Sequence, residues 1–151
     1  MNTLDELVAI RAIEGTKARY CRFMDTKRWD DWGMLFTEQA TMDVSEDVTP
    51  EMGQQIFHGR TAIVAQVRSV VGSARTVHQV HSPEITLESP TAATAIWAMH
   101  DVVVWPEDAA RPVPGLNSLT AFGHYHETYV LDAGEWRIAS LKLTRLQRFF
   151  G

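Results

Sequence analysis

The sequence predicts an α+β domain made of long antiparallel hairpins that helices cover on one face. Two observations support this fold class. Segments with apolar residues at helical spacing gather in residues 3–72, whereas residues 75–150 hold four long runs rich in β-branched and aromatic residues. The chain of 151 residues with 45% apolar content also has the size of one ordinary domain. We therefore expect a single domain over residues 1–151.

Three helices are expected in the first half of the chain. The first should run over residues 3–24, because Thr3-Leu4-Asp5-Glu6 fits a capping box and apolar residues then recur at helical spacing, interrupted by Lys17. Asp25 and Thr26 can cap a short second helix. Its buried side carries Trp29, Trp32, Leu35 and Phe36. The segment "GRTAIVAQVRSVVG" predicts a third helix that its last glycine stops.

The composition changes to that of strands from Arg75 onward. Long strands are expected over residues 75–89, 91–105, 119–131 and 135–150. A turn at Ser89-Pro90 and another at residues 132–134 connect them. The segment 106–118 holds three of the six prolines, and we interpret it as a surface loop that could act as a lid. Two brief strands, "TMDV" and "QQIFHG", are expected before the third helix.

Charge and composition exclude several classes of protein. A net charge of −5 and a pI near 5.6 argue against nucleic-acid binding. The acidic N-terminal segment does not fit a signal peptide, and no apolar stretch approaches the roughly 18 residues of a membrane span, so we expect a cytoplasmic protein without a membrane partner. The single cysteine, Cys21, has no partner for an internal disulfide and is expected in the core.

Two ionisable residues, His100 and Asp101, interrupt the apolar strand "AIWAMHDVVVW". Because side chains alternate along a strand, Asp101 shares a face with Trp97 and Met99, while His100 lies on the other face. His78 lies about as far from the Ser89-Pro90 turn as Asp101 does, so a simple hairpin sets the two near one another. This spacing is compatible with a His–Asp dyad for general-base chemistry and equally with a structural hydrogen-bonded pair.

Several other polar residues are candidates for the site. Tyr20 falls on the apolar stripe of the first helix, where its hydroxyl either polarises a substrate carbonyl or belongs to a core tyrosine. Asp25 can share that pocket only if the helix ends near Met24, and otherwise it is a helix cap. His124 and His126 share a strand face, but no third ligand accompanies them, so we expect no metal. The sequence lacks a glycine-rich phosphate loop and a nucleophile elbow, and no cofactor is expected.

The order of these segments resembles the SnoaL-like branch of the nuclear transport factor 2-like superfamily over nearly the whole chain. The likeness is carried by "ARYCRFMDTKRWDDWGMLFTEQATMD" in the opening helices, "GRTAI" at the third helix, "TVHQV" in the first long strand and "GHYHETYVLDAGEWRI" in the closing hairpin. It implies a cone-shaped α+β roll, in which a strongly curved antiparallel sheet wraps a hydrophobic pocket that the N-terminal helices close.

Within that superfamily, the residue set is most similar to bile acid 7-alpha-dehydratase and more distantly to scytalone dehydratase. The resemblance implies that His78 acts as general base and acid and that Asp101 orients it. It also implies that Tyr20 donates a hydrogen bond to a carbonyl or enolate oxygen and that Asp25 is a polar pocket residue. We expect the substrate to contact Trp97, Met99, Trp105, Phe122 and Tyr125.

Together these residues favour a cofactor-independent lyase or isomerase of dehydratase type, acting on a hydrophobic cyclic, steroid- or polyketide-like carbonyl compound. The same groups would serve a polyketide cyclase. The alternatives are a non-catalytic domain of the same fold that binds a small molecule or a partner chain, and a subunit of a larger oxygenase. Apolar residues on the outer sheet face, Ile96, Ala98 and Val102, favour a homo-oligomer, either a dimer or a trimer.

Overall fold

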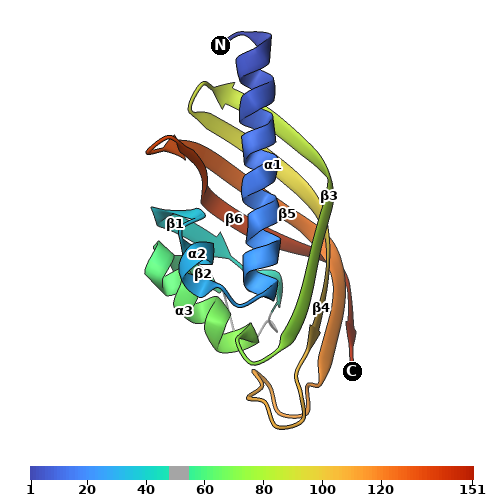
Figure 1. Ribbon diagram of the computed structural model, residues 1–151. Coiled ribbons are helices and arrows are strands. Elements are labelled where there is room, and N and C mark those ends of the chain that lie inside the picture. The colour runs from blue at the N-terminus through green and yellow to red at the C-terminus, as the bar shows by residue number, and fades with distance from the viewer. Residues whose placement is uncertain (48–54) are drawn as a thin grey trace.

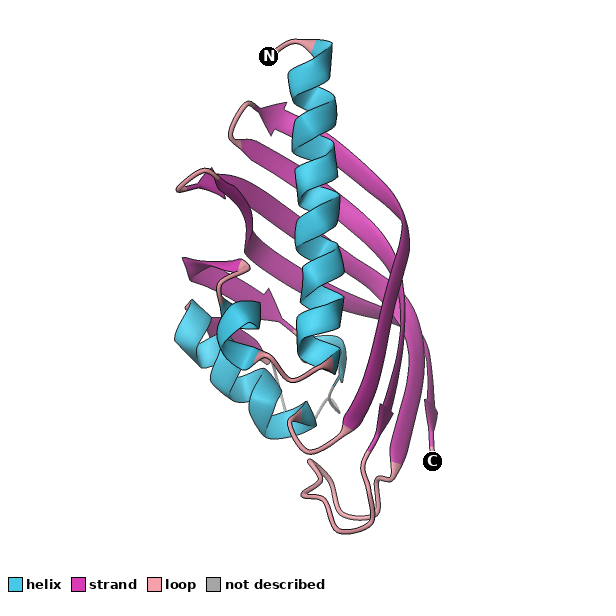
Figure 2. Ribbon diagram, viewed as in Figure 1, coloured by secondary structure: helices cyan, strands magenta, loops and turns pink. Residues whose placement is uncertain are grey.

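The structure is a computed structural model that describes residues 1–47 and 55–151. Helices gather in the first half of the chain and long strands in the second, as the sequence predicts. Figures 1 and 2 show helix α1 lying along the concave side of a curved sheet, with α2 and α3 beside its C-terminal half. The elements are α1 (Thr3–Asp25), α2 (Trp29–Gly33), β1 (Phe36–Asp43), the 3-10 helix η1 (Ser45–Asp47), β2 (Ile56–His58), α3 (Arg60–Val71), β3 (Arg75–Ser89), β4 (Ala92–Val104), β5 (Ser118–Asp132) and β6 (Glu135–Phe150).

Helix α1 begins at Thr3 as predicted, but its N-cap lies one residue before the predicted capping residue. Asn2, not Thr3, is the N-cap: its side chain accepts from the Asp5 backbone N–H at 3.0 Å, and the Asp5 carboxylate accepts from the Asn2 N–H at 3.3 Å. Asn is as good a cap as Thr, so the capping box forms one position upstream. Among the described residues, no helix combines the length and apolarity that crossing a membrane requires.

The turn after α1 overturns the prediction that Asp25 caps the second helix. Asp25 is the last residue of α1, and α2 starts after Arg28 without a side-chain cap. The Arg28 N–H donates to the Phe23 carbonyl at 2.8 Å and the Lys27 N–H to the Met24 carbonyl at 3.1 Å. With Lys27 at φ +61°, these bonds form a Schellman-type ending. The carboxylate of Asp25 is thereby left free to turn toward β3.

Six strands form one open sheet in the order β2-β1-β6-β5-β4-β3. The predicted α+β class and curved sheet are confirmed, with the edges at β2 and β3 unjoined. The expectation of a wholly antiparallel sheet is wrong, because β1 pairs parallel with β6, with Met42 opposite Leu141. Helix α1 and the short α2 bring the chain back along the sheet before β1 begins. Strand β1 therefore runs in the same direction as β6, the last strand. The predicted segment "QQIFHG" extends into residue 54, which lies outside the described residues.

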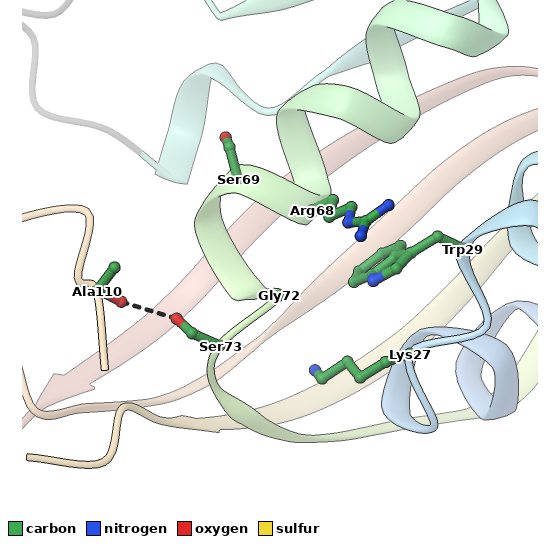
Figure 3. Close-up of a pocket in the computed structure, with 7 residues that line it drawn as sticks. All are labelled: Lys27, Trp29, Arg68, Ser69, Gly72, Ser73 and Ala110. Atoms are coloured by element: carbon green, nitrogen blue, oxygen red, sulfur yellow. Dashed lines mark hydrogen bonds between the residues drawn. The ribbon is translucent and has the colours of Figure 1, made fainter. Parts of the chain in front are cut away.

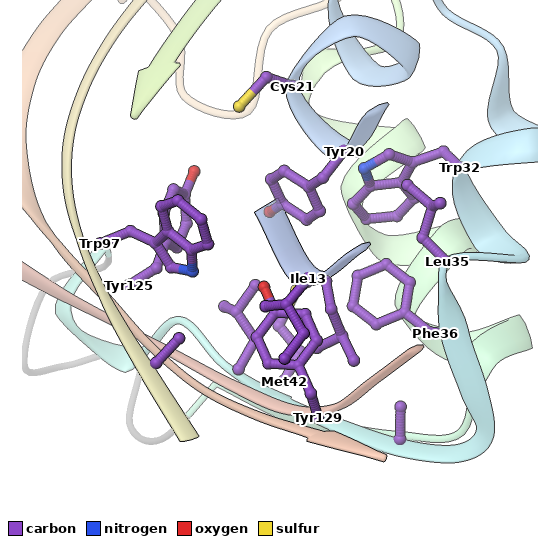
Figure 4. Close-up of a cluster of buried hydrophobic side chains, with 14 of the residues drawn as sticks. Ile13, Tyr20, Cys21, Trp32, Leu35, Phe36, Met42, Trp97, Tyr125 and Tyr129 are labelled. Carbon is purple, nitrogen blue, oxygen red and sulfur yellow. The ribbon is translucent and has the colours of Figure 1, made fainter. Parts of the chain in front are cut away.

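The main core lies between α1 and the concave face of the sheet. Figure 4 shows aromatic side chains from α1, α2 and the strands meeting there. Trp32 packs edge-on against Phe36 at 4.9 Å between ring centroids, and Tyr20 packs against Trp32 at 5.4 Å. A smaller cluster of Ala74, Val103 and Trp105 fills the end of the sheet near the β4–β5 loop. The cone is therefore packed with side chains around the buried half of α1.

A bulge in β6 adjusts the pairing of the last two strands. Gly123 lies opposite Arg145 and Phe122 opposite Gln147, which leaves Leu146 as an extra residue that faces solvent. A Cβ at position 123 would lie 1.9 Å from the Thr144 carbonyl oxygen, so the close approach of the strands requires glycine. The Arg145 side chain consequently lies inside the cone.

Candidate active site

The carboxylate of Asp25 holds the imidazole of His78. Asp25 Oδ1 lies 2.7 Å from His78 Nδ1, and Asp25 Oδ2 accepts from the His78 backbone N–H at 2.8 Å. The Thr76 hydroxyl donates to Oδ1 at 2.9 Å. These three donors belong to two residues of β3, Thr76 and His78, and explain why Asp25 leaves the start of α2 uncapped. An ionised Asp25 accepts the Nδ1 proton, so the tautomer it favours carries its lone pair on Nε2.

Asp101 lies on the other side of the same imidazole. The predicted hairpin contact is confirmed, because His78 and Asp101 are directly opposed in the β3–β4 register. Asp101 Oδ2 is 3.9 Å from His78 Nε2, which is too long for a hydrogen bond. The orienting hydrogen bond expected from Asp101 is instead made by Asp25, because the C-terminal end of α1 reaches β3. His78 is thus flanked by two carboxylates, of which only Asp25 is bonded to it.

Arg145 is a site residue that the sequence analysis missed. Its guanidinium donates twice to Asp101, from Nη1 at 2.7 Å and from Nη2 at 3.2 Å, and once to Asp47, from Nε at 2.6 Å. Burial opposes its charge, but the hydrogen bonds and charges of Asp101 and Asp47 outweigh burial and raise the pKa of Arg145. Arg145 follows Leu141 and Leu143 at two-residue intervals, and this alternation placed it on the inner face. We call Asp25, His78, Asp101 and Arg145 the site cluster.

Tyr20 lies inside the cone, on α1, five residues before Asp25. Its ring packs edge-on against Tyr125 at 5.6 Å between centroids, and only 3% of its surface is exposed. Burial, aided by the negative charge of Glu127, raises the pKa of Tyr20 well above its ordinary value. The hydroxyl therefore keeps its proton at neutral pH and remains a hydrogen-bond donor.

A second buried ion pair lies deeper in the cone, between Lys17 and Glu127. Lys17 Nζ donates to Glu127 Oε1, the Tyr129 hydroxyl donates to Glu127 Oε2, and both charged side chains are fully buried. The Lys17 ammonium also lies 3.6 Å from the ring centroids of Tyr20 and Tyr125. We call Lys17 and Glu127 the deep pair. Lys17, which interrupts the predicted apolar stripe, is thus matched by an opposite charge on the facing strand.

The five residues expected to contact substrate fall in three places. Trp97, Met99 and Tyr125 are buried on the concave face within the main core. Phe122 is on the convex face, where its ring stacks on His100 at 4.5 Å, so its assignment to the pocket is wrong. Three positions separate it from Tyr125, and strand alternation puts such residues on opposite faces. Trp105 belongs to the smaller cluster, where its indole donates to the Val70 carbonyl at 3.0 Å.

The histidines of β4 and β5 lie on the convex face. His100 faces outward as expected, and His124 and His126 lie beside each other there, with 6.2 Å between ring centroids. His126 Nε2 is 3.0 Å from the Thr144 hydroxyl. In the part of the chain that the structure describes, no three or more His, Cys, Asp or Glu side chains are grouped to hold a metal ion.

An open hollow between α1 and β3 leads to His78. It has a volume of about 470 Å³. It is lined by Ala18, Cys21, His78, Gln79, Val80 and His81. Burial raises the pKa of the Cys21 thiol to about 11, so Cys21 borders the hollow as an uncharged side chain. The site cluster therefore combines an imidazole that is hydrogen-bonded at Nδ1, a carboxylate 3.9 Å from its Nε2 and an adjoining open hollow.

The fold and the site cluster together define a helix-closed curved sheet with a buried His–Asp pair. The sequence model of the SnoaL-like domain matches residues 5–142, and the chain belongs to this family. One relative, "Probable cyclase FGR4" of Gibberella zeae, is 27% identical over 142 residues, which cover 91% of each chain.

Two solved structures show the same fold. "Putative Scytalone Dehydratase" of Novosphingobium aromaticivorans superposes with a TM-score of 0.80 at 21% identity, covering 98% of this chain and 91% of its own. The hexachlorocyclohexane dehydrochlorinase LinA-type3 of Novosphingobium barchaimii superposes with a TM-score of 0.78 at 15% identity, covering 99% and 94%. At these identities the likeness establishes the architecture alone.

Proposed function

We propose that this chain eliminates water from a hydrophobic cyclic compound that carries a hydroxyl group β to a carbonyl, without a cofactor. The observation that carries the proposal is the hydrogen bonding of His78. Its Nδ1 is 2.7 Å from Asp25, whereas its Nε2 has no hydrogen-bond partner among residues 1–47 and 55–151. A neutral imidazole fixed in this way presents the lone pair that a general base requires.

In the first step, His78 Nε2 takes the proton from the carbon α to the carbonyl. The electron pair of the broken C–H bond passes to the carbonyl oxygen, which becomes an enolate. Tyr20 donates a hydrogen bond to that oxygen, since its raised pKa keeps the phenol protonated. Asp101, 3.9 Å from Nε2, faces the positive charge that His78 acquires.

In the second step, the enolate re-forms the carbonyl and the double bond between the α and β carbons. The β C–O bond breaks, and protonated His78 gives its proton to the departing hydroxyl, which leaves as water. His78 returns to its neutral form, so the cycle needs no further reactant. Arg145 contributes by holding the Asp101 carboxylate in place with two hydrogen bonds.

The surroundings of the site support a hydrophobic substrate. Trp97, Met99 and Tyr125 are the concave-face neighbours of the site cluster. The name of the Gibberella zeae relative supports a second candidate, an intramolecular aldol cyclisation, in which the same enolate attacks a second carbonyl. Proton abstraction by His78 is common to both reactions, and it is therefore the step to test first.

A cyclic ketone with a β-hydroxyl group, 3-hydroxy-1-tetralone, tests the proposal, because its dehydration product becomes fluorescent 1-naphthol. We expect His78→Gln to lower turnover on the order of 10²- to 10⁴-fold. His124→Gln is the matched control, since His124 lies on the convex face beside His126, does not line the hollow at His78 and should leave turnover unchanged. Exchange of the ketone's α-protons with deuterium oxide reports abstraction alone. Equal exchange by the wild type and His78→Gln would show the proposal to be wrong.

We also propose that the convex face of the sheet joins copies of this chain in a homo-oligomer. The proposal is supported by exposed apolar residues on that face, among them Val77, Ile96 and Phe122. Sedimentation velocity at micromolar concentration should give a dimer or trimer, and Ile96→Lys should shift it toward the monomer. A wild-type monomer would contradict this.

A further inference from the structure

A second hollow lies outside the site cluster, where the end of α3, the start of α2 and the β4–β5 loop meet. Its volume is about 500 Å³. Figure 3 shows the Trp29 ring between Arg68 and Lys27, with Ser73 bonded to the Ala110 carbonyl at the rim. Two cationic side chains and an aromatic ring therefore line one recess, and none of them takes part in the chemistry described above.

Neither cation of this hollow has a carboxylate within ion-pair distance among the residues that the structure describes. In the described ranges 1–47 and 55–151, neither Lys27 nor Arg68 forms an ion pair, and the indole N–H of Trp29 has no acceptor. Lys27 Nζ lies 5.9 Å from the Trp29 ring centroid. Burial lowers the pKa of Lys27 against the opposing charge of Asp25, so an anion in the hollow would replace solvation that the ammonium has lost.

The C-terminal end of α3 is the feature that opposes an anion here, because helix carbonyls carry partial negative charge. Three of the last four carbonyls of α3 accept hydrogen bonds. The Gly72 N–H donates to the Arg68 carbonyl at 2.8 Å, and the Trp105 indole donates to the Val70 carbonyl at 3.0 Å. The Ala74 N–H donates to the Val71 carbonyl at 3.1 Å. Their repulsion on a ligand is correspondingly reduced.

The backbone of Lys27 is a separate observation in favour of a side-chain role. Its φ of +61° lies in the left-handed region, which the residue after a helix commonly adopts as glycine. A lysine at this position carries a steric cost that glycine avoids. Among the described residues, the only hydrogen bond that its ammonium makes is to the Thr76 hydroxyl, at 3.0 Å.

We propose that this hollow binds an oxyanion, either a carboxylate or a phosphate monoester. Lys27 and Arg68 supply charge-assisted donors, the Trp29 indole supplies a third N–H, and its ring forms an apolar wall for an attached aryl group. The site goes beyond the proposed dehydration and does not depend on it.

A chain of hydrogen bonds links this hollow to His78. Lys27 donates to Thr76, Thr76 donates to Asp25, and Asp25 accepts from His78 Nδ1. An anion that draws the Lys27 ammonium away from Thr76 alters the hydrogen bonding of the carboxylate that orients His78. Binding of an anion in the hollow therefore changes the environment of the His78 imidazole.

Nuclear magnetic resonance titrations of the full chain test the proposal, with inorganic phosphate and benzoate as separate probes and sodium chloride holding the ionic strength constant. We expect saturable shifts of the Trp29 indole N–H and of the Ser69 and Ser73 amides, with a smaller shift of the His78 ring. Tighter binding of benzoate identifies an aryl carboxylate as the ligand, and tighter binding of phosphate identifies a phosphate monoester. Shifts that do not saturate, or that spread over unrelated surfaces, overturn the site.

Two variants make the result specific. Lys27→Gly removes the ammonium while giving the left-handed backbone its favoured residue, so the fold is retained, and Arg68→Met removes the second charge. Each should raise Kd about tenfold through loss of one charge-assisted donor. Arg11→Met, an exposed change on the distant half of α1, should leave Kd unchanged. Equal binding by Lys27→Gly and the wild type, or equal weakening by Arg11→Met, contradicts the proposal.

Discussion

The site cluster and the deep pair both contain buried charges on the concave side of one sheet. They differ in whether hydrogen-bonding atoms remain free to bind a ligand. In the deep pair, Lys17 and Tyr129 occupy both oxygens of Glu127, and the charged side chains are fully buried. In the site cluster, Asp25 keeps 22% of its side chain exposed, and His78, which lines a hollow, has no hydrogen bond at Nε2 among the described residues. Burial alone thus does not separate the two groups, and we propose that the unfilled hydrogen-bonding capacity of the site cluster is what makes it reactive.

The largest effect is expected at the deep pair. Lys17→Met should lower the free energy of unfolding by about 3–5 kcal/mol, because it leaves the Glu127 carboxylate buried without its counterion. Urea denaturation measures this loss. The double variant Lys17→Met/Glu127→Gln should recover most of it, since no uncompensated charge remains. If the single variant is as stable as the wild type, the deep pair is not what holds this part of the core.

Substitutions in the site cluster should instead lower the rate of the proposed reaction. Asp25→Asn should lower kcat for 3-hydroxy-1-tetralone on the order of 10²-fold, about 2.7 kcal/mol of barrier, because the amide no longer fixes the Nδ1–H tautomer of His78. Asp101→Asn should have a smaller effect, since Asp101 is not hydrogen-bonded to the ring. A larger loss in Asp101→Asn would restore Asp101 as the orienting partner.

Substitution of Arg145 should affect stability as well as rate, because Arg145 stabilises a carboxylate that faces His78. Arg145→Lys should cost about 1.5 kcal/mol in stability, since lysine cannot donate in parallel to both oxygens of Asp101. Arg148→Lys on the same strand is the matched control. Thermal denaturation of the two variants compares them directly, and equal melting temperatures would mean that the two-point contact adds nothing.

The smallest effect concerns Cys21, which lies on α1 between the deep pair and the site cluster. Its folded pKa of about 11 is above the ordinary 9.0, so its stabilising contribution is present below pH 9 and is lost as the pH rises toward 11. Alkylation by iodoacetamide at pH 8 should be roughly 100-fold slower in the folded than in the unfolded chain. Mass spectrometry follows the reaction. A fast folded-state reaction would mean that the hollow beside Cys21 is more polar than this pKa implies.

Periodicity predicted most of the fold because it reflects local rules. The ends of α1 and α3, the β3–β4 hairpin and the opposition of His78 and Asp101 all follow from spacing along the chain. The parallel pairing of β1 with β6 does not, because an amphipathic strand pattern does not specify its partner. The hydrogen bond between Asp25 and His78 is equally non-local, since it depends on where the end of a helix meets a strand.

Strand alternation and helical spacing also carry two signals from which no prediction was drawn. Glu127 shares its strand face with Tyr125 and Tyr129, and Lys17 lies on the inner stripe of α1, so an opposite pair of buried charges could have been predicted. The same alternation excludes Phe122 from the pocket. The hollow at Lys27 and Arg68 could not have been predicted in this way, because its walls come from segments that are far apart in the sequence.

The parallel contact between β1 and β6 also has a consequence for the order of folding. The β3–β4, β4–β5 and β5–β6 pairs join strands that are neighbours along the chain and can form early. The β1–β6 pair joins residues far apart in the sequence, such as Thr41 and Ser140, and can form only after β6 is made. Closing so long a segment costs conformational entropy before any contact rewards it. During synthesis, β1 therefore leaves the ribosome well ahead of β6, and the edge of β1 that pairs with β6 stays unpaired until that strand emerges.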